Sequence, residues 1–129
     1  MNKIFLFLLV FTYQITIFSQ IEIPTRATDD TTYFIIVRVM PEPIGGIEEL
    51  SSKLYYTEVA KKFNIQGKIS VLAYINEEGT VDSAMVLQGL GYGLDEIASE
   101  AVFQTKFTPG KQDGVNVKVQ LVIPIFFRL

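Results

Sequence analysis

Three pairs of neighbouring carboxylates are the side chains in this sequence best suited to chemistry. The pairs are Glu48 and Glu49, Glu77 and Glu78, and Asp95 and Glu96. A hydrolase would need two carboxylates in one cleft, with separated pKa values, so that one group donates a proton and the other accepts it. Two of the pairs fall instead at the start of an expected helix, where negative charge is favourable, and the third falls at a hairpin tip. The pairs are therefore explained without catalysis.

The residue inventory narrows the chemistry further. The chain has no cysteine and no histidine. This excludes thiolate nucleophiles, disulfides, imidazole bases and zinc sites of the usual nitrogen and sulfur type. No serine lies beside a plausible base. We therefore expect a protein that is not an enzyme, with no cofactor, no bound metal and no small-molecule substrate.

The glycine-rich stretch GLGYG, residues 89–93, follows an expected strand and precedes an expected helix. This is the setting of a phosphate-binding loop, but the glycine spacing does not match GxGxxG and no lysine follows. Asp95 and Glu96 would place negative charge where a phosphate group must bind. We interpret the stretch as a turn.

The chain length and the net charge indicate the number of domains and the classes of partner to expect. The 129 residues suit one domain with a proper core, and about half of them are apolar. The net charge of −3 offers no basic surface for nucleic acid or for an anionic membrane. We expect no nucleic-acid partner.

The N-terminus is typical of a secretory signal peptide, with Lys3 followed by an apolar run. Cleavage after Ser19 defines a signal peptide over residues 1–19 and a short exposed tether over residues 20–32. Such a protein would be exported across a membrane. The alternative is a retained membrane anchor, because the uncharged stretch from Ile4 to Ile21 reaches the short limit for a membrane span. Membrane contact is expected only in that case.

Hydrophobic periodicity places the secondary structure of the remaining domain, residues 33–129. Strands are expected at 33–39, 68–76, 80–88 and 115–127, a helix from Ile47, and a continuation or second short helix within 56–63. A further helix is indicated by apolar spacing at Leu94, Ile97, Ala98, Ala101 and Val102. We expect Val59, Ala60 and Phe63 to face inward, and Phe63, Phe103 and Phe107 to belong to the core. The fold class is α+β, a small antiparallel β-sheet with two helices packed on one face.

The last expected strand has the clearest alternation in the sequence. Its inward side would carry Val115, Val117, Val119, Leu121, Ile123, Ile125 and Phe127. A long half-buried strand at the end of a chain leaves open whether its outer edge is covered. It could pair within the chain, with a second copy, or with a foreign segment.

Several motifs follow one another in a fixed order: PEPIGG (41–46), YTEVAKKFNIQGKISV (56–71), NEEGTVDS (76–83), GLDEIASEAV (93–102) and FTPGKQDGVNVKV (107–119), with the ending PIFFRL. Through these motifs the sequence resembles the C-terminal domain of the TonB family, the periplasmic energy transducers of Gram-negative bacteria. The resemblance extends from Met40 to Leu129. The shared order and spacing of these motifs make the resemblance specific.

The resemblance implies a partner and a binding site. Family members add a short segment of an outer-membrane TonB-dependent transporter, the TonB box, as an extra strand at the sheet edge, in transmembrane transport. The implied partner-binding residues are Leu54, Tyr55, Val115, Asn116, Val117, Lys118, Val119, Gln120 and Leu121. The expected function is recognition of that extended segment in the periplasm by strand addition (β-augmentation).

Three departures from the family pattern bear on this expectation. The Tyr-Pro of the family is here Tyr56-Thr57, and its usual glycine before Ile-Gln-Gly is Asn64. Family transducers also carry a membrane helix with a functional histidine and a long proline-rich linker, whereas this chain has no histidine and a tether that reaches at most about 45 Å. A secreted, unanchored domain is therefore the leading expectation. The alternatives are an anchored minimal transducer and a structural or assembly domain that forms homodimers through its edge strands.

Overall fold

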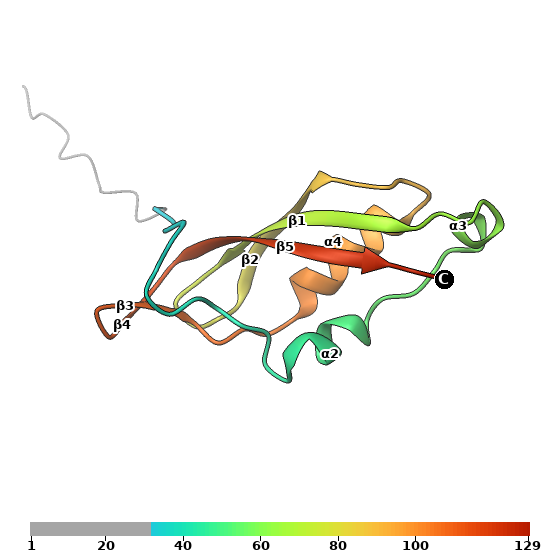
Figure 1. Cartoon of the computed structure of the whole chain (residues 1–129). Coiled ribbons are helices and arrows are strands. Elements are labelled where there is room, and N and C mark those ends of the chain that lie inside the picture. Colours follow the sequence, from blue (N-terminus) through green and yellow to red (C-terminus); the bar gives the residue numbers. More distant parts are fainter. Residues whose placement is uncertain (1–31) are drawn as a thin grey trace, which may run out of the picture. The chain divides into compact units, whose positions relative to one another are not determined.

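Strand β1 (Gly67–Ile75) is the centre of a three-stranded antiparallel sheet with the order β2-β1-β5 (Figure 1). Alternate residues of β1, namely Ile69, Val71, Ala73 and Ile75, are fully buried. Strand β2 (Val81–Gln88) and strand β5 (Val119–Phe127) flank it. The structure is a computed structural model that describes residues 32–129, so the expected signal peptide and most of the expected tether lie outside the described residues. Within residues 32–129, no helix has the length and hydrophobicity needed to cross a bilayer.

The hairpin between β1 and β2 forms where the sequence predicted it. Asn76 organises the turn, because its side-chain oxygen accepts hydrogen bonds from the backbone N–H groups of Glu78 (3.1 Å) and Thr80 (3.0 Å). Gly79 adopts the left-handed conformation, with φ +82°, that such a turn requires. The turn thereby sets which residues of the two strands face each other.

Helix α4 (Leu94–Gln104) supplies one layer of the core, as its apolar spacing predicted. It packs on β1 and β2, and its buried residues are Leu94, Ile97, Ala98, Ala101 and Val102. Helix α2 (Gly46–Ser51) contacts α4 and inserts the fully buried Leu50 into the same core. The molecule is therefore α+β, a small antiparallel sheet with helices on one face, as expected.

The short helix α3 (Glu58–Lys62) confirms the expected second helix but corrects the face it buries. Ala60 is fully buried, as expected, whereas Val59 and Phe63 are 50% and 59% exposed. A helix of this length has room for one inward position, so its flanking apolar residues remain in contact with solvent. Asn64 follows the helix in the left-handed conformation, with φ 51°.

The two other phenylalanines expected in the core have different outcomes. Phe107 is 1% exposed, and its assignment to the core is confirmed. Phe103 is 49% exposed on α4, so that expectation is wrong. The inward stripe of α4 is already filled by residues 97, 98, 101 and 102, which leaves position 103 on the outer side of the helix.

The expectation of one continuous strand over 115–127 is wrong. Strand β4 (Val115–Val117) pairs with β3 (Gly110–Gln112) in a separate two-stranded sheet, and β5 begins only at Val119. A tight turn at Asp113 (φ 51°) and Gly114 (φ +78°) folds β4 back on β3. As a result Val115 is 63% exposed, although the alternation placed it on the inward side.

The expected strand over 33–39 is also not formed. Phe34 makes a single parallel bridge to Val119, and Val39 makes a single antiparallel bridge to Lys111. The segment passes from the edge of β5 to the edge of β3, so neither pairing extends into a ladder. Its β-rich composition matches an edge contact rather than a strand of the sheet.

Tyr33 fastens the start of this segment to the sheet. Its ring packs edge-on against Tyr74 at 4.9 Å between centroids, and its hydroxyl donates to Asp82 Oδ2 at 2.8 Å. Burial, together with the hydrogen bond and the negative charge of Asp82, raises the pKa of Tyr33 to about 12. The contact holds the neighbouring Phe34 at the beginning of β5.

Candidate functional site

The outer edge of β5, on the side away from β1, is the candidate functional site. At its beginning, Phe34 N–H donates to Lys118 O at 2.8 Å, and Gln120 N–H donates to Phe34 O at 2.9 Å. The backbone groups of Gln120 therefore point away from β1. Because the pairing of β5 with β1 is regular over its whole length, the backbone groups of Val122, Pro124 and Phe126 point the same way. Within residues 32–129 no backbone segment pairs with them.

Pro124 makes this open edge discontinuous. Proline has no backbone N–H, so position 124 offers only its carbonyl oxygen to an added strand. Val122 and Phe126 offer both a donor and an acceptor. Proline inside a strand is tolerated at an edge, and here its ring nitrogen faces away from β1. The edge can therefore pair with a short segment, anchored at Val122 and Phe126.

The side chains along this edge alternate between two surroundings. Ile123, Ile125 and Phe127 are buried beneath the helices, whereas Val122 and Phe126 are 50% and 55% exposed on the opposite face. A strand added to this edge would also alternate its side chains between the two faces of the sheet. Every second side chain of the added strand would lie on the exposed face, next to Val122 and Phe126.

The remaining side chains of the added strand would point to the opposite face, where a depression lies at the end of the edge. This depression has a volume of about 250 Å³ and is lined by Ser51, Leu54, Tyr55, Tyr56, Phe126, Phe127 and Arg128. Tyr56 holds the loop between α2 and α3 against the strand, because its ring packs edge-on on Phe127 at 5.5 Å and its hydroxyl donates to Ile65 O at 3.0 Å. Loop and strand together form a groove whose wall is largely aromatic.

The opposite edge of the sheet, on β2, is less suited to strand addition. The pairing of β2 with β1 shifts register between Ser70 and Val71 and again between Tyr74 and Ile75. Each shift inserts an extra residue in β2, which bends the strand and disturbs the spacing of its outward groups. The regular β5 edge is the better template.

The structure divides the site residues predicted from the sequence into two groups. Leu54 and Tyr55 line the depression beside Phe126 and Arg128, so the fold brings them to the β5 edge. Val115, Asn116 and Val117 belong instead to β4 and its pairing with β3.

The remaining predicted residues lie where β5 begins. Lys118 O and Gln120 N–H are hydrogen-bonded to Phe34. Val119 is fully buried, and the register turns the backbone groups of Val119 and Leu121 towards β1. The open part of the edge starts one residue after the predicted set.

The resemblance maps the binding edge onto the strand from Val115 to Phe127, but the site residues chosen from it stop at Leu121. They leave out Val122, Pro124 and Phe126, which form this open part of the edge. One signal was present in the sequence. Pro124 interrupts an otherwise apolar strand, and a proline in such a place marks an edge with its nitrogen facing outward. That signal fixes both the free edge and which alternate residues face it.

Asp95, one of the paired carboxylates, has a structural role. Asp95 Oδ1 accepts the backbone N–H groups of Leu90 (2.8 Å) and Gly91 (3.1 Å), so its carboxylate holds the glycine-rich corner as a turn. It occupies the position that a bound phosphate would need, in agreement with the turn predicted there.

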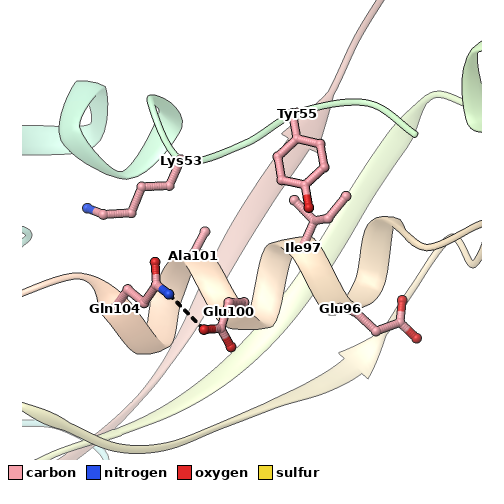
Figure 2. A pocket seen from close by; sticks show the side chains of 7 residues that line it. All are labelled: Lys53, Tyr55, Glu96, Ile97, Glu100, Ala101 and Gln104. Carbon is pink, nitrogen blue, oxygen red and sulfur yellow. Dashed lines mark hydrogen bonds between the residues drawn. The ribbon is translucent and has the colours of Figure 1, made fainter. Parts of the chain in front are cut away.

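A larger depression lies between the loop before α3 and helix α4, with a volume of about 440 Å³. Figure 2 shows Tyr55 pointing from that loop towards Ile97, with Glu96 and Glu100 on the same helix. Gln104 Nε2 donates to Glu100 Oε1 at 2.7 Å. Glu96 and Glu100 lie one helical turn apart on the exposed side of α4, and they make this helix surface polar.

Comparisons with known proteins agree on one family. Residues 52–129 match the family described as Gram-negative bacterial TonB protein C-terminal. Protein TonB of Vibrio cholerae serotype O1 is 35% identical over 75 residues, which are 57% of this chain and 31% of that protein. The chain thus matches about a third of the length of that curated relative.

Two solution structures of a TonB C-terminal domain from Helicobacter pylori are similar as well. The first is 27% identical with a TM-score of 0.49, and the match covers 62% of this chain and 85% of that one. The second is 26% identical with a TM-score of 0.49, covering 64% and 76%.

Proposed function

Because the chain belongs to the family of Gram-negative bacterial TonB C-terminal domains, we propose that it is a non-enzymatic module that binds an extended segment of a partner protein. The segment adds as a strand to the open edge of β5. The partner we propose is an outer-membrane transporter of the TonB-dependent class, and the role is in transport across the envelope.

The observation that carries this proposal is the unpaired, regular edge from Val122 to Phe126. Its outward backbone groups have no partner among the described residues, and the aromatic groove lies at its end. Strand addition obtains affinity from such backbone groups and specificity from pockets that take alternate side chains. The β5 edge provides both.

The expected affinity is modest. Each backbone hydrogen bond contributes about 1 kcal/mol net, and association must also offset the loss of rotational and translational freedom. The open edge is short and lacks one donor at Pro124. We expect dissociation constants on the order of micromolar, which suits a contact that forms and releases during transport.

An NMR titration tests the proposal. Isotopically labelled protein is titrated with peptides taken from the periplasm-facing N-termini of outer-membrane transporters. We expect amide shifts at Val122, Phe126 and Arg128, with Leu54 and Tyr55 following as the groove fills. Shifts confined to β2, or no shifts with any peptide, would contradict strand addition at β5.

Two alternatives make different predictions for the same protein. A homodimer formed through β5 edges would show a mass in light scattering that falls on dilution. An anchored minimal transducer would retain the N-terminal segment, whereas the periplasmic form would begin at Gln20 in mass spectrometry of the mature protein. The proposed periplasmic module is monomeric at low concentration and begins at Gln20.

A further inference from the structure

The Phe126 end of the open edge carries positive charge. Two depressions meet around Phe126, one of about 360 Å³ that includes Lys68 and Arg128, and the groove of about 250 Å³ that also includes Arg128. Among residues 32–129, no aspartate or glutamate lines either of them. The chain as a whole has a net charge of −3, so this cationic end contrasts with the rest of the protein.

Arg128 is held against the ring of Phe126. Its guanidinium carbon lies 5.6 Å from the centroid of the Phe126 ring, which is the geometry of a cation–π contact. Lys68 stands on β1 directly across from Phe126 in the register of the sheet. Within residues 32–129 the ion pairs are those of Lys53 with Glu49 and of Lys61 with Glu58, and neither includes Arg128 or Lys68.

The location ties this charge to the open edge. The backbone N–H and carbonyl groups of Phe126 point outward, so a strand that pairs there passes within side-chain reach of Arg128. A planar guanidinium that rests on a ring keeps its N–H donors available at its rim. The group with matching geometry and charge is a carboxylate, which can accept two of these donors at once.

We propose that Arg128, assisted by Lys68, selects extended partners that carry an acidic side chain beside Phe126. This inference rests on the proposed function, because it assigns a chemical preference to the same edge. In a partner strand parallel to β5 the acidic residue lies towards the C-terminal end of the bound segment, and in an antiparallel strand towards its N-terminal end. The preference thus also reports the direction of the bound strand.

Synthetic peptides of alternating valine and threonine, about seven residues long, provide the probe. One peptide carries glutamate near its C-terminal end, a second carries it near its N-terminal end, and the controls carry glutamine at the same positions. Affinities are measured by fluorescence anisotropy with wild-type protein, Arg128→Gln and Arg38→Gln. Arg38 belongs to the segment that contacts the beginning of β5 and β3, so its substitution changes the net charge equally at the other end of the edge.

We expect one of the two glutamate peptides to bind wild type about three- to fivefold more tightly than its glutamine counterpart. Arg128→Gln should bring the affinity for that glutamate peptide down to the affinity for its glutamine counterpart, so that the ratio of the two falls to about one. Arg38→Gln should retain the difference, and Arg128→Lys should retain part of it. Circular dichroism of each variant verifies that the fold is intact.

The possible outcomes distinguish a failure of the carboxylate preference from a failure of the proposed strand addition. Equal binding of glutamate and glutamine peptides, with shifts at Val122 and Phe126, would overturn the carboxylate preference and leave strand addition standing. Equal losses in Arg128→Gln and Arg38→Gln would reduce the effect to net charge and overturn the inference as well. The absence of edge shifts with all four peptides would overturn both.

Discussion

The backbone N–H of Gln120 donates to the carbonyl oxygen of Phe34 at 2.9 Å, so the outer edge of β5 is already paired where the strand begins. Phe34 in turn donates to Lys118 O at 2.8 Å. These two bonds set the upstream limit of the open edge. A partner strand that extends beyond Val122 towards the start of β5 must displace Phe34.

Replacing Phe34 with proline should release this limit. The substitution removes the N–H that donates to Lys118 O and disturbs the carbonyl group that accepts from Gln120. We expect the Gln120 amide to exchange with solvent about fivefold faster, corresponding to one hydrogen bond of about 1 kcal/mol. Amide hydrogen exchange followed by NMR measures the change.

The matched control is Ile36→Ala, at a side chain that is 84% exposed in the same segment. Its Gln120 amide should exchange as in wild type. If the Gln120 amide of the Phe34→Pro variant also exchanges as in wild type, Phe34 does not protect the edge.

Val122 and Pro124 provide a pair of opposite substitutions. Val122→Pro removes an outward donor without breaking the pairing to β1, whereas Pro124→Val adds a donor in the middle of the open edge. We expect the first to weaken and the second to strengthen peptide binding, each by about fivefold, the value of one net hydrogen bond. Isothermal titration calorimetry with one edge-binding peptide measures both.

Both substitutions should leave the unfolding midpoint within a few degrees of wild type, because neither N–H position is used inside the domain. Pro124→Val should also raise self-association in light scattering, since it completes an exposed edge. Unchanged affinity in both variants would place the peptide elsewhere on the sheet.

The elements predicted best from the sequence are those whose patterns depend on local residues. The hairpin at Asn76 and Gly79 follows from turn chemistry, and α4 follows from the spacing of Leu94, Ile97 and Ala101. In both cases the same residues decide the local conformation and the buried face. Tertiary contacts agree with the local preference, so the prediction holds.

The prediction for the C-terminal strand was wrong at its start, where the chain pairs with the neighbouring segment β3. The alternation continues from Val115 to Phe127, but a strand's partner is not encoded in its own alternation. The turn at Asp113 and Gly114 pairs β4 with β3, and Phe34 takes the edge at Lys118 and Gln120. The pattern identified extended backbone correctly and could not divide it between two sheets.

The residues of the candidate site could likewise be predicted only in part. Leu54 and Tyr55 were assigned through the family resemblance, and they do lie at the end of β5. The residues of the open edge, Val122, Pro124 and Phe126, are set by which backbone groups of β5 face away from β1. The hydrogen bond from Gln120 N–H to Phe34 O establishes which alternate residues face outward, and in the sequence only Pro124 indicates it.

Tyr33 should make the stability of the domain depend on pH in the alkaline range. Its pKa is raised from 10.0 to about 12 by burial first and then by Asp82, so the folded state favours the neutral phenol. Above pH 10 the unfolded chain loses this proton first, and stability falls until the pH reaches the folded pKa. The contribution is complete below pH 10 and is lost between pH 10 and 12.

Urea unfolding at pH 9, 10 and 11 measures this loss, which is below about 1.4 kcal/mol per pH unit for one group. Tyr33→Phe should be about 1 kcal/mol less stable at pH 9 and should lose less stability as the pH rises. Asp82→Asn removes the charge that helps to raise the pKa, so its slope should lie between the two. Parallel curves for all three proteins would show that the Tyr33 contact does not titrate as described.

Gly79 should be the turn glycine least tolerant of substitution. Its φ is +82°, and a Cβ there would overlap the carbonyl oxygen of Phe107, whose own N–H donates to Gly79 O at 2.9 Å. Gly91 offers a matched comparison, because its φ is +73° but a Cβ there would meet no atom within 4 Å. The two positions share the backbone strain and differ in the overlap.

We therefore expect Gly91→Ala to cost about 1 kcal/mol of unfolding free energy, the strain of a left-handed alanine. Gly79→Ala should cost about 3 kcal/mol or more, because the hairpin tip must also move away from Phe107. Urea unfolding monitored by circular dichroism measures both values. Since Phe107 is 1% exposed, its displacement should also expose core amides to exchange in Gly79→Ala alone. Equal costs at the two glycines would mean that the hairpin tip does not press on the Phe107 backbone, and the position of that turn against the core would need to be revised.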